Sequence, residues 1–289
     1  MARAYLIAGA GGMLGTALVR ACGERGLRCE APPEAGFDIT DTAEVGDVAG
    51  AFVASLGPGE RGVLVNAAAY TNVERAEDDP ETAYRVNEDG ARVLAEAARD
   101  AGLGFVHVST DFVFDGAKHG AYSETDEPNP LSVYGASKLA GERAVLAADP
   151  GALIVRTAWV FGENGVNFPT KILGFARERD ELAVVTDEVG SPTYTLDLAR
   201  GILELVEAGA TGIFHLAGSG SCTRFELAVE VLCLSGLTRR LVPVIADAFP
   251  SKAPRPANSV LDCSKAAAVG VTMPEWRDAL RRFIAGLSE

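Results

Sequence analysis

Apolar runs alternate with amphipathic stretches along the first 160 residues of the chain. Each short run rich in Val, Ile and Leu predicts a buried strand, and the stretch after it repeats its apolar residues about every 3.6 positions, which predicts a helix. The predicted strands are residues 4–8, 27–31, 62–66, 104–110 and 152–157. This alternation predicts an α/β fold with a Rossmann-type, doubly wound parallel sheet.

The pattern is looser after residue 160. Helical and strand-like repeats recur there at residues 168–178, 182–185, 196–207, 212–217, 225–234 and 274–287. Residues 242–259 are rich in proline and show little periodicity. We interpret this last segment as a functional loop or lid.

A glycine-rich turn lies between the first predicted strand and the first predicted helix. Gly9, Gly12 and Gly15 have the spacing G-x-x-G-x-x-G. The first glycine permits a tight turn, the second lets the backbone approach a pyrophosphate, and the third lets the helix pack on the strand. The start of the helix adds free N–H groups and a partial positive charge. Strand, glycine turn and helix in this order predict a dinucleotide-binding site.

Tyr134 and Lys138 are four residues apart in a segment of good helix formers. On a helix these two positions share one face, so the phenol and the ammonium are expected to be neighbours. A nearby positive charge favours the phenolate, so we expect the pKa of Tyr134 to fall from about 10 toward the range of an acid catalyst. By itself such a pair is common in structural helices, and its interpretation depends on the rest of the chain.

The residue after the second strand normally reads the adenosine ribose, where an acid suits a free 2′-OH and an arginine suits a 2′-phosphate. This chain has Pro32-Pro33-Glu34 there, which is neither signal. Both NADPH and NADH therefore remain open as the cofactor.

Two other segments are candidates for cofactor contact. Asp38 is interpreted as touching the adenine side, while Thr40 or Asp41 as a plain helix N-cap is the alternative interpretation of that group. The small residues Ala67 to Ala69 follow the strand at 62–66 and let a cofactor lie close to the backbone. For these alanines the alternative is tight packing of helix on sheet.

Composition narrows the classes of partner. The formal net charge is −14, which argues against nucleic acid or anionic lipid. We expect neither a membrane span nor a signal peptide, because no apolar run is long enough. The five cysteines are scattered without C-x-x-C pairing, which favours reduced thiols and a cytoplasmic location. His107 and His215 lie inside predicted strands and are interpreted as structural, and no metal site is predicted.

With these residues in view, the chain resembles the dTDP-4-dehydrorhamnose reductase family of the extended short-chain dehydrogenase/reductase superfamily. Tyr-x-x-x-Lys at 134–138 marks the superfamily, while the Ser-Thr-Asp-Phe-Val-Phe-Asp-Gly run at 109–116 and the Arg-Pro-Ala-Asn-Ser run at 255–259 are more specific. The other matching segments are residues 9–15, 38–41, 66–71, 156–162, 167–168 and 190–193.

The resemblance implies a role for each matching residue. Tyr134 would donate a proton to the C4 carbonyl of a dTDP-linked keto-sugar as the nicotinamide delivers hydride, and Thr110 would hydrogen-bond the same oxygen. Lys138 would bind the nicotinamide ribose and lower the pKa of the phenol. The implied substrate contacts are Thr110, Asp111, Trp159 and Arg255, the last as a diphosphate clamp. The implied cofactor contacts are Gly9, Gly12, Met13, Leu14, Asp38, Ile39, Ala67, Ala68, Ala69, Tyr134 and Lys138.

The resemblance also implies a reductase acting on dTDP-4-dehydro-L-rhamnose or a related sugar, in a homodimer. Phe112 stands where the family usually has tyrosine, and family members that bind magnesium use glutamates that we could not match here. One alternative is a nucleotide-sugar dehydratase or epimerase. Dehydratases follow Thr-Asp with a glutamate, and Phe112 cannot move protons. Another alternative is a non-catalytic NAD(P)-binding regulatory subunit.

These segments predict two domains. Residues 1–160 are assigned to the dinucleotide-binding domain, to which residues 184–207 return. Residues 161–183 and 208–289 are assigned mainly to a smaller, mixed α/β substrate-binding domain.

Overall fold

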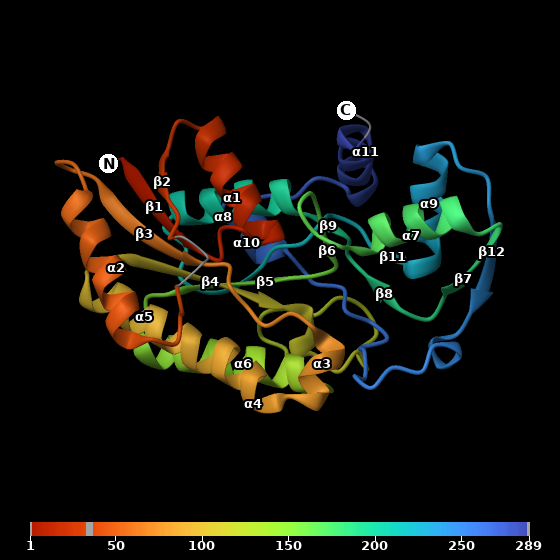
Figure 1. Cartoon of the computed structure of the whole chain (residues 1–289), viewed down its shortest axis with the longest axis horizontal. Coiled ribbons are helices and arrows are strands. Elements are labelled where there is room, and N and C mark those ends of the chain that lie inside the picture. The colour runs from red at the N-terminus through yellow and green to blue at the C-terminus, as the bar shows by residue number, and fades with distance from the viewer. Residues whose placement is uncertain (1, 33–36, 288–289) are drawn as a thin grey trace.

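A six-stranded parallel sheet forms the centre of the computed structural model, which describes residues 2–32 and 37–287 (Figure 1). Its strand order is β10-β5-β4-β3-β1-β2. The strands are β1 (Arg3–Ala8), β2 (Arg28–Glu30), β3 (Arg61–Asn66), β4 (Gly104–Thr110), β5 (Leu153–Thr157) and β10 (Gly212–His215). The order reverses between β1 and β3, and open α/β sheets bind ligands at the carboxyl ends of the strands at such a point. The predicted Rossmann-type sheet is confirmed.

Helices cover both faces of this sheet (Figure 1). On one face lie α1 (Met13–Glu24) and α8 (Thr195–Glu207), and on the other lie α2 (Thr42–Ser55), α5 (Ala91–Asp100) and α6 (Val133–Ala148). Each layer is held by its own apolar cluster of buried side chains. Both faces of the sheet are therefore shielded from water. Strands that are apolar along their whole length need this cover, because their side chains point to both faces.

Shorter helices extend the second layer toward α6. They are α3 (Val73–Asp78), α4 (Pro80–Tyr84) and a π-helical turn (Arg85–Gly90) that leads into α5. The amphipathic stretch between the strands predicted at 62–66 and 104–110 is expected to be helical. That segment is interrupted by the π turn, which turns Asn87 inward so that its side chain bonds the backbone of Tyr70 and the hydroxyl of Ser137. Such turns concentrate at functional sites.

A smaller part of the chain packs beside the carboxyl edge of the sheet (Figure 1). Its helices α7 (Phe168–Glu178) and α9 (Arg224–Ser235) pack together beside a parallel pair of strands, β7 (Glu181–Val185) and β12 (Arg240–Val244). The remaining elements are β6 (Val160–Phe161), β8 (Val189–Gly190), β9 (Thr193–Tyr194), β11 (Cys222–Thr223), α10 (Ser264–Ala268) and α11 (Trp276–Gly286), with 3-10 turns at Asp111–Val113 and Ala246–Ala248.

Part of the segment predicted as a lid is regular. Residues 242–244 belong to β12, because each of these three apolar residues pairs with a residue of β7. From residue 245 to residue 259 the chain is irregular apart from the short turn Ala246–Ala248 and a β-bridge between Asn258 and Val189. The domain division stays a prediction. β10, from the segment assigned mainly to the second domain, pairs with β5 in the large sheet.

No helix in the described ranges is long and apolar enough to cross a membrane.

Candidate active site

The glycine turn joins β1 to α1 at the point where the strand order reverses. Gly9 has a φ of 78°, and a Cβ there would lie 2.6 Å from the backbone nitrogen of Ala68. A Cβ on Gly15 would lie 2.0 Å from the carbonyl oxygen of Gly9. The turn, the start of α1 and the loop after β3 therefore pack together so closely that only glycine fits at these two positions.

Gly12 differs from its two neighbours in the motif. A Cβ on Gly12 would meet only the Gly9 carbonyl, at 3.3 Å. Gly12 is the N-cap of α1, whose N-terminus has no side-chain cap and no acidic residue in its first turn. The N–H groups of Met13 and Leu14 are placed there at the positive end of the helix dipole, a suitable cradle for a pyrophosphate.

The predicted adenine-side residues lie before α2. Asp38 accepts hydrogen bonds from the backbone and hydroxyl of Thr40, and these bonds hold the pKa of Asp38 below its ordinary value. Ile39 is buried against Gly90. Asp41 caps α2 by accepting from two backbone N–H groups, so it has the plain capping role. Of the Pro32-Pro33-Glu34 stretch, Pro33 and Glu34 lie outside the described residues.

The catalytic candidates meet at the carboxyl end of β4. Ser132 caps α6, which puts Tyr134 in its first turn and Lys138 one turn further on. Tyr134 is half-buried, its ring packs edge-on against Phe112 with centroids 5.5 Å apart, and the Thr110 side chain lies close enough to the phenol to act on its pKa. Lys138 is buried, and its Nζ donates to the carbonyl oxygen of Val108 at 2.7 Å.

Burial controls the protonation of this pair. It raises the pKa of Tyr134 to about 12, against the effect of the Thr110 side chain, and it lowers the pKa of Lys138 to about 8, against the charge of Glu142. Our expectation that Lys138 lowers the pKa of the phenol is therefore wrong for the protein by itself. The ammonium is directed to the backbone of β4, and the loss of water around the phenol outweighs it.

Asp111 comes directly after Thr110, at the start of the 3-10 turn that follows β4. The Thr110 hydroxyl donates to the Asp111 carboxylate at 3.0 Å, and the N–H of Phe112 donates to the Thr110 oxygen at 3.2 Å. Burial raises the pKa of Asp111 to about 6, while Ser259, Thr110 and the positive charge of Arg224 act to lower it. The short 3-10 turn after β4 thus fixes the Thr110 hydroxyl near the phenol.

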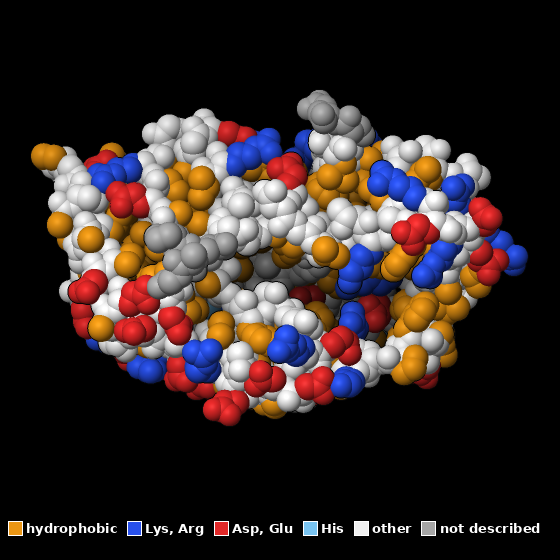
Figure 2. All heavy atoms as spheres, in the orientation of Figure 1, with side chains coloured by type: hydrophobic (Ala, Val, Ile, Leu, Met, Phe, Trp, Pro, Cys, Tyr) orange, Lys and Arg blue, Asp and Glu red, His pale blue; other side chains and the backbone are white. Residues whose placement is uncertain are grey.

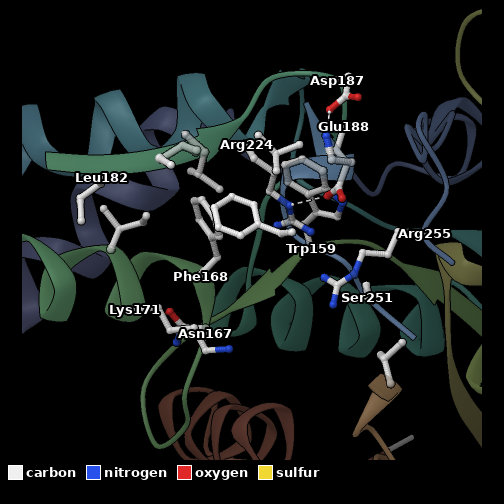
Figure 3. A pocket seen from close by; sticks show the side chains of 18 of the residues that line it. Trp159, Asn167, Phe168, Lys171, Leu182, Asp187, Glu188, Arg224, Ser251 and Arg255 are labelled. Atoms are coloured by element: carbon white, nitrogen blue, oxygen red, sulfur yellow. Dashed lines mark hydrogen bonds and ion pairs between the residues drawn. The ribbon is translucent and has the colours of Figure 1, made fainter. Parts of the chain in front are cut away.

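Trp159 lies where the smaller part of the chain meets the sheet. Its φ is 44°, and a Cβ on Gly190 would lie 2.2 Å from its ring. The guanidinium of Arg224 stacks on the Trp159 ring at 3.4 Å and donates to Glu188 at 3.3 Å (Figure 3). Sequence reasoning missed Arg224, because an arginine at the start of a helix has no signal of its own.

A cavity of about 1410 Å³ opens beside this stack. The molecule is hollowed between the regions of α3 and α7, with Lys and Arg side chains beside the hollow (Figure 2). The cavity brings together the predicted contacts Trp159 and Arg255, with Arg224 and Phe168 (Figure 3). Thr110, Tyr134, Lys138 and the glycine turn do not line it. They lie at the edge of the sheet. Asp111 lies between the two regions, because the positive charge of Arg224 in the cavity lowers the pKa of its carboxyl group.

Arg255 lies on the irregular segment, where its guanidinium pairs with Glu74 of α3 at 2.9 Å. The Ser251 hydroxyl and the Lys252 N–H also donate to Glu74. These bonds hold the pKa of Glu74 at about 2. The segment is thereby fastened across one side of the cavity.

The geometry defines a class of protein. A doubly wound sheet, a glycine turn at its switch point and a Tyr-x-x-x-Lys helix after β4 are the features of the extended short-chain dehydrogenase/reductases. More narrowly, the chain belongs to the family of the RmlD substrate binding domain, whose model matches residues 3–289.

Relatives of known name agree with this assignment. A dTDP-4-dehydrorhamnose reductase of Mycolicibacterium smegmatis is 40% identical, over 99% of this chain and 86% of that protein. A crystal structure of a dTDP-4-dehydrorhamnose reductase from Clostridium acetobutylicum has a TM-score of 0.92 and 36% identity, covering 99% of this chain and 100% of the other. The enzyme of that name from Bacillus anthracis, in complex with NADP, has a TM-score of 0.92 and 33% identity, with the same coverage.

Proposed function

We propose that this chain is an NADPH-dependent reductase of the C4 keto group of a dTDP-4-keto-6-deoxy-hexose. The first candidate substrate is dTDP-4-dehydro-L-rhamnose and the product dTDP-L-rhamnose, with a related deoxysugar as the alternative. The observation that carries the proposal is the Thr110–Tyr134 pair at the carboxyl end of β4, in the sheet that also carries the glycine turn, in a chain similar over nearly its whole length to enzymes of that name.

NADPH is proposed as the cofactor, with NADH as the alternative, because the Bacillus anthracis relative was solved with NADP. When bound, the nicotinamide supplies hydride. The open N-terminus of α1 supports a pyrophosphate contact at Gly12, Met13 and Leu14. The remaining proposed cofactor contacts are Gly9, Asp38, Ile39, Ala67, Ala68, Ala69, Tyr134 and Lys138.

Tyr134 is proposed as the acid. Burial keeps its phenol protonated across the working pH range, as a group that gives up a proton in a reduction requires. The Thr110 hydroxyl lies near the phenol, and its one proton, which Asp111 accepts in the substrate-free protein, is proposed to turn to the oxygen that becomes negative as a second hydrogen bond. Lys138 completes the set as the proposed ribose contact.

The cavity supports a nucleotide-linked sugar. Arg224 and Arg255 both line it, and the pKa of Arg224 is lowered by burial first, with the charge of Arg255 as a smaller contribution. Two guanidinium groups that repel each other are stabilised by an anion between them, and a diphosphate supplies two negative charges. Asp111 and Trp159 are the further proposed substrate contacts.

A dehydratase is less well supported. Phe112 takes the place after Thr110 and Asp111, and its ring packs against Tyr134. A hydrocarbon ring cannot carry the proton that an elimination must remove.

The assembly and location are further proposals. We propose a homodimer in the cytoplasm, on the family resemblance and the scattered cysteines. Size-exclusion chromatography with light scattering measures the former, and a mass of one chain would contradict it.

The test of the function is the fall in nicotinamide absorbance when the purified chain is mixed with dTDP-4-dehydro-L-rhamnose. NADPH and NADH are compared in parallel, with the UDP-linked sugar as the matched control. We expect turnover with the dTDP sugar. Tight binding of NADPH without turnover on any dTDP-4-keto-sugar would favour the regulatory subunit instead.

A further inference from the structure

The N–H group of Val133, directly before Tyr134, is bound by a helix from another part of the chain. Oε1 of Glu77 accepts from it at 2.8 Å. Glu77 belongs to α3 and precedes Val133 by 56 residues. The first N–H groups of a helix have no partner within the helix, so they depend on acceptors from elsewhere. The start of α6 is therefore tied to α3.

A second acceptor at this helix start is local. Ser132, the N-cap, accepts from the N–H of Gly135 at 3.2 Å with its hydroxyl and from the N–H of Ala136 at 2.9 Å with its carbonyl oxygen. Both bonds lie within residues 132–136, so they shape the first turn without fixing its place in the molecule. Glu77 is held by a different helix and can fix that place. Its carboxylate also carries the negative charge that the positive end of a helix favours.

The backbone of Tyr134 is held on its other side as well. The carbonyl oxygen of Tyr134 accepts from the Ser137 hydroxyl at 2.9 Å, and Nδ2 of Asn87 donates to that hydroxyl at 2.9 Å. Tyr134 is therefore fixed on one side by Asn87 through Ser137, and on the other side by Glu77. A release of either bond frees one end of the turn that carries the phenol.

Helix α3 is itself held in place, which lets Glu77 act as an anchor. Ala76 is fully buried, and α3 packs against α6 and α4. On the side of the cavity, Glu74 of the same helix pairs with Arg255 at 2.9 Å. One short helix thus contacts both the proposed substrate side of the site and the catalytic helix.

We propose that Glu77 is a positioning residue for the reaction, which binds the N–H of Val133 and so holds Tyr134 in place at the carboxyl end of β4. The importance of this bond for catalysis rests on the proposed function. A hydrogen bond to a carboxylate is stronger than one to a neutral oxygen. A displacement of about 1 Å can cost on the order of a hundredfold in rate, so a bond one residue away from the acid is well placed to matter. Glu77 acts through Val133 and takes no part in the proton transfer.

The test compares two substitutions of Glu77 in the nicotinamide absorbance assay, with the sugar that the wild type reduces. Glu77→Met removes the acceptor, while Glu77→Gln keeps an acceptor and removes only the charge. We expect kcat to fall about tenfold or more in Glu77→Met and to stay within about threefold of wild type in Glu77→Gln. KM for NADPH and for the sugar should change little in both. Equal losses of kcat in the two variants, or no loss in Glu77→Met, would overturn the proposal.

A further variant removes the donor and leaves the acceptor. Proline has no N–H and is favoured at the first position of a helix. Val133 holds that position in α6, and Ser132 before it has φ −117° and ψ 158°, the extended conformation that a following proline requires. We expect Val133→Pro to lower kcat about as much as Glu77→Met, and the double variant to lower it no further. Losses that multiply in the double variant would mean that the two residues act independently, against the proposal.

Hydrogen exchange in the cofactor-free protein gives a readout that needs no substrate. Release of the first turn should speed the exchange of the Gly135 and Ala136 amides about tenfold in Glu77→Met, with Glu77→Gln near the wild type. Glu81→Met, at an exposed position in the adjacent helix α4, loses the same charge and should change neither exchange nor kcat. Exchange at the wild-type rate in Glu77→Met would contradict the proposal. A chain that reduces no sugar but shows the expected exchange would contradict the proposed function alone.

Discussion

At the scale of single residues, burial decides the chemistry of the site more than charge pairs do. It raises the pKa of Tyr134 and of Asp111 and lowers the pKa of Lys138, so each of these groups is moved toward its neutral form. A site that disfavours charge suits a reaction in which an oxygen anion must be neutralised by a donated proton.

The raised pKa of Asp111 predicts a pH-dependent stability. With a folded pKa of about 6, above the unfolded value of about 3.9, the native state holds this proton more tightly. The stabilisation is complete below about pH 4 and is lost as pH rises through 6. Asp111→Asn should therefore gain roughly 1 kcal/mol in unfolding free energy relative to wild type between pH 5 and pH 8.

Urea unfolding at the two pH values measures this gain. Exposed Asp180→Asn is the control, and its difference from wild type should stay constant. A difference for Asp111→Asn that shrinks toward pH 8 would mean that the buried carboxylate is stabilised by its partners instead.

At the scale of elements, the glycines of the turn have two different roles: Gly15 is required for packing, and Gly12 is proposed to contact the cofactor. Gly15→Ala should destabilise the fold, because its Cβ meets backbone atoms at 2.0 Å. Gly23→Ala in the same helix meets nothing within 4 Å and should stabilise the fold by about 1 kcal/mol.

Gly12→Val should keep the melting temperature near that of the wild type and lose NADPH affinity, measured by fluorescence titration. Unchanged affinity would make the turn merely structural.

Helix α6 is anchored by a buried ion pair that the sequence did not reveal. Glu142 accepts from the Arg156 guanidinium at 2.6 and 2.9 Å and also from Ser109. Both charged side chains are 2% exposed. Since α6 carries Tyr134 and Lys138, this pair fixes them against β4 and β5.

Glu142→Gln should cost about 3–5 kcal/mol, because it leaves the guanidinium buried without its counter-charge. The double variant Glu142→Leu/Arg156→Met should recover most of that loss. Glu96→Gln, in a surface pair with Arg92, is the matched control and should cost at most about 0.5 kcal/mol. Equal losses at the two sites, in chemical unfolding, would contradict the anchoring role.

At the scale of the whole molecule, local patterns predicted the sheet and the glycine turn well. Apolar runs are properties of neighbouring residues, so β1, β3, β4 and β5 were found within a residue or two. The resemblance added candidate residues that sequence spacing by itself did not provide. Trp159 and Arg255 do line one cavity.

What the sequence did not predict depends on contacts between distant segments. The Arg224–Trp159 stack joins positions 65 apart, and the Glu142–Arg156 pair needs α6 to lie on β5. The protonation of Tyr134 was predicted wrongly because helical spacing gives the neighbour but not the burial. β12 was missed because its partner strand is more than 50 residues away.

The segment with Arg255 gives a prediction at this scale. A diphosphate is expected to replace Glu74 as the partner of Arg255. Arg255→Gln should therefore raise KM for the sugar nucleotide about tenfold or more, with little change in kcat or in KM for NADPH. Lys252→Gln, on the same segment but paired with Asp78, is the control. Equal effects of the two variants would indicate a loosened segment and not a lost anion contact.

The most direct test of the account is the Tyr134→Phe variant in the nicotinamide absorbance assay with a dTDP-4-keto-6-deoxy-hexose. The change keeps the ring that packs on Phe112 and removes only the hydroxyl. We predict that turnover falls on the order of a hundredfold or more while NADPH binding stays close to wild type. Turnover near the wild-type rate would contradict the account, because the phenol could not then be the proton donor.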